Sequence, residues 1–381
     1  MEFIPFNKPY VTGTEIDCIN KAIANRKFSG NGEFTNLCQS YFENKYGFKK
    51  CLLTSSCTDA LEMAAILFDI APGDEVIMPS YTFVSTANAF ILRGAKIVFA
   101  DSSPENPNIH PGEIEKLITK NTKAIVVVHY AGQACEMEKI MAIADKHNLF
   151  VVEDAAQAID NYYVAENKEK KPLGSIAHLG TFSFHETKNI HCGEGGMLVI
   201  NDDKFLKRAE IIWEKGTNRS AFFRGEIDKY GWVDVGSSFL MSELTAAFLY
   251  GQLQNMEAIQ LRRKEIENLY QQYLSPLIAT NKCRLQQTCD YSLNNAHMFY
   301  LVCKTNEERN NLVVEMKNYG IQSVFHYISL HSSAFYKHKH DGRVLPYSDF
   351  YTNCLLRLPF FYEIDNSQIQ YIAEKISSFY K

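Results

Sequence analysis

Short apolar runs alternate with polar and amphipathic stretches between residues 74 and 202. The runs are rich in Val, Ile and Phe, which favour β-strands, and they occupy residues 74–80, 95–101, 123–130, 148–156, 179–186 and 195–202. Residues 112–119 and 136–148 instead carry apolar side chains at helical spacing, with Ile140 and Ala144 on one face. Strands that alternate with helices predict crossover connections and a mainly parallel, buried sheet.

The pattern changes at the end of this region. No long helical pattern separates the runs at 179–186 and 195–202, so we expect an antiparallel neighbour in that part of the sheet. The charged segment 165–174 is typical of a surface loop.

The last third of the chain is arranged differently. A helical pattern over 242–274 predicts a long helix that leads out of the large domain. We therefore expect a large α/β domain of residues 1–250 and a small α+β domain of residues 251–381. The small domain is expected to contain strands at 297–304 and 322–330 and helices at 308–320 and 367–381.

The composition narrows the class of protein. The chain has 381 residues, 46% hydrophobic and 22% charged, which is ordinary for a soluble globular protein. A net charge of −5 without a basic tail argues against a nucleic-acid partner, and no apolar run reaches the roughly 18 residues of a membrane span. The N-terminus lacks an export signal, and the ten cysteines show no zinc spacing. We expect reduced thiols, no metal and a cytoplasmic location.

Three features fall at predicted strand ends, where open α/β sheets bind their ligands. Cys57 and Thr58 begin a helix whose free N–H groups favour an anion, although N-capping by Ser56 or Thr58 explains the same residues. Asp154 ends an apolar strand, where a carboxylate needs a metal, a cation or a protonated ring nitrogen unless it is a solvated loop acid or a helix cap. Lys188 precedes a glycine cluster; a buried amine there would be a nucleophile, and a surface lysine beside a turn is the alternative.

Together, these three features match the needs of pyridoxal 5′-phosphate. The helix N-terminus would bind the phosphate, Asp154 would keep the pyridine nitrogen protonated, and Lys188 would bond covalently to the cofactor. Once displaced by substrate, the amine of Lys188 could carry a proton between the substrate carbon and the cofactor.

The order of motifs resembles one family over nearly the whole chain. The segments "SCTDAL", "SYTFVSTANAF", "VHYAG", "VVEDAAQ" and "SFHETKN" followed by "GEGG" are similar to the DegT-type (DegT/DnrJ/EryC/StrS) sugar-nucleotide aminotransferases, which are fold-type I pyridoxal-phosphate enzymes. Longer stretches, such as "PGDEVIMPSYTFVSTANAF", resemble the dTDP-4-amino-4,6-dideoxygalactose transaminases within that family. The resemblance implies an aspartate aminotransferase-like α/β fold, with a large, mainly parallel seven-stranded sheet and a smaller C-terminal α+β domain.

The resemblance also implies roles for single residues. Lys188 would be the cofactor lysine, Asp154 would pair with the pyridine nitrogen, and Gln157 would bind the ring hydroxyl. Ser183 would hold the phosphate with Cys57 and Thr58. Phe83 would stack on the ring, although its spacing alone favours a core residue. The other implied site residues are Ser238, which stands where most of the family has Asn, and, on the substrate side, His185, Glu194, Arg219, Tyr230, His326 and His331.

The implied activity is a transamination by a homodimer with shared active sites. It would convert dTDP-4-keto-6-deoxy-D-glucose and L-glutamate into a dTDP-4-amino-4,6-dideoxyhexose and 2-oxoglutarate, for surface polysaccharide such as O-antigen. The resemblance slightly favours the galacto product. The gluco product is the alternative, because the loop after Lys188 is one residue shorter than in the dTDP-4-amino-4,6-dideoxygalactose transaminases. Alternatives are a C3-aminotransferase of a dTDP-3-keto-6-deoxyhexose and a non-catalytic sugar-nucleotide-binding or regulatory protein. A pyridoxal-phosphate-dependent sugar dehydratase of this fold would have histidine in place of Lys188.

Overall fold

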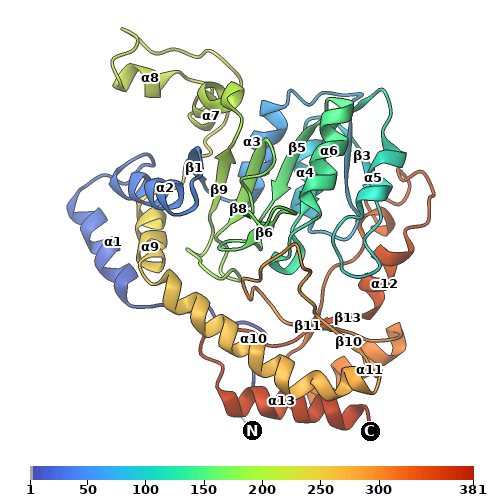
Figure 1. The fold of residues 1–381 in the computed structure, drawn as a ribbon. Helices are drawn as coiled ribbons and strands as arrows, with labels where there is room; N and C mark the ends of the chain where they lie inside the picture. The colour runs from blue at the N-terminus through green and yellow to red at the C-terminus, as the bar shows by residue number, and fades with distance from the viewer. Residues whose placement is uncertain (1–2) are drawn as a thin grey trace.

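The computed structural model describes residues 3–381, and a seven-stranded sheet forms the centre of this part of the chain (Figure 1). The strand order is β1-β9-β8-β5-β4-β2-β3. The strands β2, β3, β4, β5 and β8 pair in parallel, whereas β9 runs antiparallel to both β8 and β1. The sheet is therefore mainly parallel with an antiparallel neighbour, as the sequence predicts. Its strands are β1 (Lys50–Thr54), β2 (Glu75–Pro79), β3 (Lys96–Ala100), β4 (Thr122–Val128), β5 (Phe150–Asp154), β8 (Leu179–Ser183) and β9 (Gly196–Ile200).

Helices cover both faces of this sheet because nearly every strand position is apolar. Alternate side chains of one strand enter opposite cores: Val151 packs on one face and Val152 on the other. The first face is covered by α1 (Thr14–Ala24), α2 (Glu33–Tyr46), α5 (Pro111–Leu117), α6 (Met137–His147) and α9 (Glu243–Leu253). The second is covered by α3 (Cys57–Leu67), α4 (Val84–Ile91) and α7 (Leu206–Trp213).

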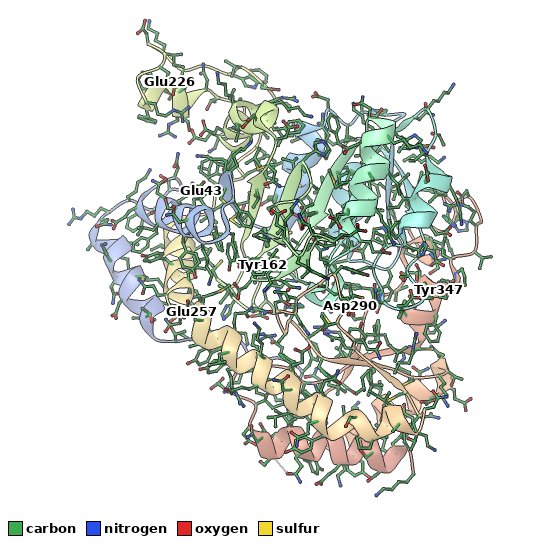
Figure 2. The ribbon with its side chains drawn as sticks, viewed as in Figure 1. Glu43, Tyr162, Glu226, Glu257, Asp290 and Tyr347 are labelled. Carbon is green, nitrogen blue, oxygen red and sulfur yellow. The ribbon has the colours of Figure 1, made fainter. Side chains whose placement is uncertain are left out.

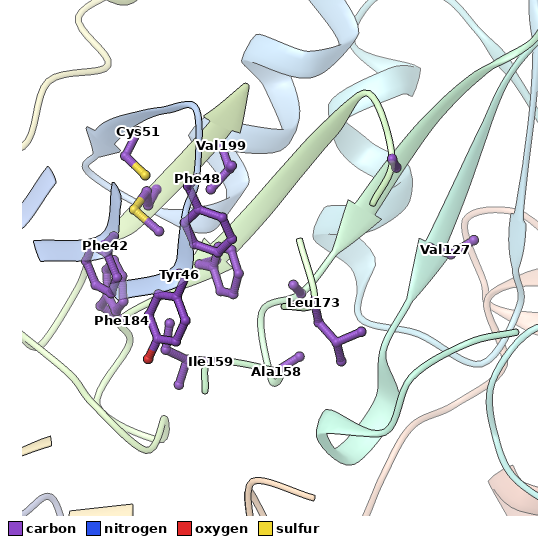
Figure 3. Close-up of a cluster of buried hydrophobic side chains, with 14 of the residues drawn as sticks. Phe42, Tyr46, Phe48, Cys51, Val127, Ala158, Ile159, Leu173, Phe184 and Val199 are labelled. Carbon is purple, nitrogen blue, oxygen red and sulfur yellow. The ribbon is translucent and has the colours of Figure 1, made fainter. Parts of the chain in front are cut away.

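Aromatic packing on the first face fixes the segment that follows β8. Phe184 is fully buried, and its ring stacks on Phe42 of α2 with the centroids 5.5 Å apart (Figure 3). Tyr46 and Phe48 extend the same cluster. Because Phe184 directly follows the last residue of β8, this packing anchors the start of the loop that carries Lys188.

A second, four-stranded antiparallel sheet lies below the first in Figure 1, with the order β10-β11-β13-β12. It has its own apolar core, to which α10 and α13 contribute Ile266 and Ile372. No helix within residues 3–381 combines the length and apolar character needed to cross a bilayer. The elements of this region are α10 (Met256–Ala279), β10 (Arg284–Leu285), β11 (Tyr300–Val302), α11 (Asn306–Asn318), β12 (Val324–Phe325), α12 (Pro346–Cys354), β13 (Leu355–Arg357) and α13 (Asn366–Phe379).

Several sequence predictions of element bounds need correction. The helix expected over 242–274 is two helices, α9 and α10, because the chain breaks at Gln254 and Asn255. Asn255 turns its amide toward the N-terminal segment and donates to Thr14 Oγ1 at 2.8 Å. The strand expected at 322–330 is only β12, and the one expected at 297–304 is only β11. The charged segment 165–174 contains β7 (Lys170–Pro172), which pairs with β6 (Tyr162–Val164).

One segment stands apart from both cores. Residues 214–238 contain the short helix α8 (Arg219–Phe223), which projects beyond the helices that cover the sheet (Figure 1). Figure 2 shows Glu226 at this projecting part of the molecule. The segment exposes aromatic side chains: Trp232 is 84% exposed and Phe223 66%.

Candidate active site

The residues singled out from the sequence meet at the carboxyl ends of the parallel strands. Asp154, the last residue of β5, lies opposite Val128 of β4 and Thr181 of β8. Ser183, the last residue of β8, lies opposite Gly196 of β9. A cavity of about 570 Å³ opens at this edge, which is where open α/β sheets bind ligands.

The N-terminus of α3 forms one wall of the cavity. Ser56, rather than Thr58, is the N-cap, because its Oγ accepts a hydrogen bond from the Asp59 N–H at 3.0 Å. Thr58 instead donates its hydroxyl to Ser85 Oγ at 2.8 Å. The first N–H groups of a helix have no acceptor inside it, so Cys57 and Thr58 present an anion-binding end to the cavity.

Gly196 explains one glycine of the cluster that follows Lys188. It lies directly beside the helix start, and a Cβ atom there would collide with the backbone of Ser56 and Cys57. Thr54, Gly196 and Ser183 lie side by side in the register of the three neighbouring strands. Only glycine therefore allows β9 to bring Ser183 this close to the helix start.

Asp154 is held by short contacts at the floor of the cavity. Thr86 donates its hydroxyl to Oδ2 at 2.8 Å, and the Ala156 N–H donates to Oδ1 at 3.2 Å. Burial raises the pKa of Asp154, while the Thr86 hydrogen bond and the Lys188 amine act in the opposite direction. Each carboxylate oxygen keeps a free lone pair, so the group can accept a further hydrogen bond from a protonated ring nitrogen.

Lys188 lies on a loop that main-chain hydrogen bonds close. The Phe184 N–H donates to Gly195 O at 2.8 Å, and the Lys188 N–H donates to His185 O at 2.9 Å. Burial lowers the pKa of the Lys188 amine to about 8, whereas Cys57 and Asp154 favour its charged form. An amine with this pKa is partly neutral near pH 7 and can act as a nucleophile or a base.

The opposite wall comes from the C-terminal region. His326, Tyr327 and Arg357 line the cavity there. Gln157 connects the two walls: its Oε1 accepts from the Ala131 N–H at 2.6 Å, and its Nε2 donates to the Tyr327 hydroxyl at 3.1 Å.

Aromatic side chains from both walls meet at the cavity. Phe83 is 55% exposed at the cavity, and its ring centroid lies 6.0 Å from that of Tyr327. An exposed phenylalanine at a cavity is unlike a core residue, so its position suits a face that a planar ligand would cover.

The structure divides the other predicted site residues into two groups. His185 and Glu194 line the cavity, with His185 Nε2 3.6 Å from a Glu194 carboxylate oxygen. His331 instead is buried away from it, with Nδ1 2.7 Å from Ser80 Oγ. Arg219, Tyr230 and Ser238 belong to the exposed segment 214–238 and do not reach the cavity of their own chain.

Sequence reasoning missed several residues that line the cavity, among them Thr86, Tyr327 and Arg357. Thr86 lies inside a short helix and carries no signal, and Tyr327 lies in an aromatic-rich stretch that is equally typical of a core. Arg357 could have been found, since it is the one charged residue in the apolar run "CLLRLPFF". Within residues 3–381, no three His, Cys, Asp or Glu side chains are grouped closely enough to hold a metal ion.

The chain is similar to known aminotransferases in sequence and in fold. A model described as the DegT/DnrJ/EryC1/StrS aminotransferase family matches residues 9–377. The GDP-perosamine synthase of Escherichia coli O157:H7 is 30% identical over 387 residues, which cover 100% of this chain and 99% of that protein. The crystal structure of a DegT DnrJ EryC1 StrS aminotransferase from Brucella abortus superposes with a TM-score of 0.85 at 26% identity, over 96% and 95% of the two chains. The putative sugar aminotransferase Spr1654 of Streptococcus pneumoniae, in its PLP form, shares the fold with a TM-score of 0.89 at 23% identity, over 99% and 98% of the chains.

Proposed function

Because the chain belongs to the DegT/DnrJ/EryC1/StrS aminotransferase family, and is therefore a pyridoxal-phosphate-dependent sugar transaminase, we propose that it transfers the amino group of L-glutamate to C4 of dTDP-4-keto-6-deoxy-D-glucose. The products are a dTDP-4-amino-4,6-dideoxyhexose and 2-oxoglutarate. The observation that carries the proposal is the meeting of Lys188, Asp154 and the N-terminus of α3 in one cavity.

The residues present fit pyridoxal phosphate. The phosphate needs unpaired N–H donors, and the start of α3 with Ser183 beside it supplies an anion site that the bare backbone of Gly196 keeps open. The pyridine nitrogen needs a carboxylate, and Asp154 is buried with free lone pairs. Phe83 supplies an exposed aromatic face, and Gln157 supplies an amide next to the ring position.

The cofactor, when bound, supplies the electron sink that makes a C–H bond next to nitrogen acidic. The chain supplies the proton transfer and the electrostatics. Lys188 removes a proton from the donor carbon and delivers one to the sugar C4, for which an amine pKa of about 8 is close to neutral pH. Asp154 holds the positive charge of the ring nitrogen, and the hydrogen bond from Thr86 keeps its carboxylate oriented.

A homodimer with shared sites completes the proposal. Residues 214–238 expose Phe223, Tyr230 and Trp232 in a single chain, and such apolar surface usually marks an interface. In a dimer, Arg219, Tyr230 and Ser238 would line the cavity of the second copy. The reaction would take place in the cytoplasm, where the ten free cysteines stay reduced, and would serve surface polysaccharide such as O-antigen.

The resemblance of long stretches, with serine at position 238, supports the C4 keto-sugar and a dTDP carrier. The galacto epimer is slightly favoured, and the gluco epimer is the alternative because the lysine loop is one residue shorter. The E. coli relative carries GDP in its name, so a GDP-linked keto-sugar belongs in any test. A C3-aminotransferase is the second alternative.

Product analysis tests the proposal. The purified protein, loaded with pyridoxal phosphate, is incubated with L-glutamate and, separately, dTDP- and GDP-linked 4-keto- and dTDP-3-keto-6-deoxyhexoses. We expect 2-oxoglutarate and one aminated sugar from the dTDP-4-keto substrate. Small couplings of H4 on both sides identify the galacto product, and large couplings identify the gluco product. Nitrogen on C3, or turnover only with the GDP-linked sugar, would contradict the assignment. Binding of the sugar without any loss of glutamate would support a non-catalytic protein.

A further inference from the structure

Arg357 brings an uncompensated positive charge to the wall opposite Lys188. It is the last residue of β13, next to Tyr300 of β11 and Val324 of β12, and its side chain lines the cavity. Its guanidinium lies near enough to Lys188 for the two positive charges to repel measurably, and this repulsion adds to the lowering of the Lys188 pKa.

No group in the described chain neutralises this charge. The Arg357 Nε is buried without a hydrogen-bond acceptor within residues 3–381. The neighbours that favour its charged form are the hydroxyls of Tyr130, Tyr327 and Tyr81, and no carboxylate is among them. The guanidinium also lies over the ring of Phe6, 4.5 Å from the centroid. Burial lowers the pKa of Arg357, yet an arginine remains charged in proteins.

Arg263 shows that this chain can satisfy a buried arginine when the role is structural. Its Nε donates to Ala296 O at 3.0 Å and its Nη2 donates to His297 O at 2.6 Å. Main-chain oxygens thus accept hydrogen bonds from the guanidinium of Arg263. Arg357 has a similar cation–π contact but lacks these acceptors, so its charge is available for an anion that enters the cavity.

We propose that Arg357 binds a carboxylate of the amino donor. The inference rests on the proposed function and adds the residue that recognises the first substrate. The planar fork of a guanidinium matches a carboxylate with two parallel hydrogen bonds. An amino acid that delivers its nitrogen next to Lys188 places a carboxylate within a few ångströms of that nitrogen, and Arg357 is the arginine that lines the same cavity.

The same residue distinguishes the two substrates that use the cavity in turn. A keto-hexose ring carries no charge, so it gains little from a guanidinium. Its nucleotide diphosphate is negatively charged but is separated from the reacting carbon by most of the sugar ring. Arg357 therefore contributes to the affinity for the donor much more than to that for the sugar.

Binding of glutarate tests the inference, because this dicarboxylate has no amino group and cannot react. The holoenzyme and its R357Q, R357K and R309Q variants are titrated with glutarate by calorimetry. Arg309 is the matched control: it stacks on Phe325 at 5.6 Å and donates to Asn353 O, but it does not line the cavity. The loss of two charge-assisted hydrogen bonds predicts about a 100-fold weaker affinity in R357Q. R357K keeps the positive charge but loses the planar guanidinium that can form two parallel hydrogen bonds, which predicts about a tenfold weaker affinity for glutarate. R309Q should bind glutarate as the unaltered protein does.

The glutamate half-reaction separates this inference from the proposed function. Bleaching of the bound cofactor by glutamate in the unaltered protein establishes the amino donor. In R357Q the glutamate concentration at half-maximal rate should rise about 100-fold, while the return reaction with keto-sugar, started from the aminated cofactor, changes less than threefold. Glutarate affinity unchanged in a folded R357Q, as judged by its thermal transition, would overturn the inference and leave the function intact. An unaltered protein that does not react with glutamate would overturn the proposed donor, and the inference with it.

Discussion

The cavity and the segment 214–238 are built in opposite ways. At the cavity, Asp154, Ser183 and Gly196 are in register on buried strands, and each has its neighbours within one chain. In segment 214–238, Trp232 is 84% exposed and no hydrophobic core of the described residues includes it. The residues Lys188, Asp154 and Ser183 line a cavity within one chain, whereas Arg219 and Tyr230 would reach a cavity only in the proposed dimer.

Removal of the Lys188 amine from the cavity is expected to have the largest effect on turnover. Lys188→Ala should lower turnover by about four orders of magnitude, because the amine is both the covalent anchor and the proton carrier. The chain should still fold and bind pyridoxal phosphate non-covalently through the start of α3. Turnover by stopped-flow absorbance and cofactor retention by gel filtration check this, with Lys146→Ala on α6 as the control. Full activity in Lys188→Ala would refute the proposed mechanism.

Replacing the charged Asp154 carboxylate with a neutral amide should have the next largest effect on turnover. Asp154→Asn should slow the proton-transfer step by about 10³-fold, because an amide no longer holds the proton of the pyridine nitrogen. A deuterated glutamate Cα should then show a larger isotope effect on kcat than in the unaltered protein. The exposed Asp145→Asn on α6 serves as the control. A variant with unchanged kcat and only weaker cofactor binding would make Asp154 an anchor rather than an electrostatic partner.

A charge at the expected dimer interface should weaken the assembly. Trp232→Asp should weaken dimerisation and lower activity about tenfold, because a charge replaces an exposed aromatic side chain there.

Mixing two impaired variants tests whether active sites are shared between subunits. Lys188→Ala chains alone are inactive, but after mixing with Arg219→Ala chains, one of the two sites in each mixed dimer is intact. Random exchange of subunits then restores about a quarter of the normal activity.

Light scattering on the same samples gives the molecular mass of the assembly and so distinguishes a dimer from a monomer. A fully active monomer, or mixed chains with no restored activity while Arg219→Ala alone is impaired, would show that each site is complete in one chain and would remove the contrast between the two regions.

The smallest expected effect concerns pH. Only the neutral amine of Lys188 can capture pyridoxal phosphate covalently, and with a pKa of about 8 its neutral fraction rises about fivefold from pH 7 to pH 8. The rate of capture by the cofactor-free protein, followed by absorbance, should rise by this factor and level off above pH 9. A rate that keeps rising tenfold per unit to pH 10 would indicate an ordinary, solvated lysine.

The sequence predicted the strands that bring Asp154 and Lys188 together because Val, Ile and Phe dominate them. It missed β1, whose residues "KCLLT" lack β-branched apolar side chains and whose strand partner, β9, is distant in sequence. It could not predict that 242–274 breaks at Asn255, because a tertiary contact with Thr14 favours the break.

The site was predicted unevenly for a similar reason. Family motifs identified the residues on the large sheet, whose spacing is local. The charge of Arg357 within an apolar run was a local signal. That Arg357 and Tyr327 reach the cavity, however, depends on the packing of the second sheet against the first, which no local pattern encodes.

The pairing of β1 with β9 also bears on how the protein is made. In the seven-stranded sheet β1 has no strand neighbour other than β9, so Thr54 and the start of α3 gain their place in the sheet only after the chain has been synthesised past Ile200. Contacts this distant in sequence are entropically costly to form and are made late in folding. A ribosome-bound chain that ends just before β9 already carries Lys188 but lacks the strand that holds Thr54 and the start of α3 beside Ser183. Because a ligand stabilises only the folded state that binds it, a cofactor bound at this helix start would stabilise chains whose central sheet is complete.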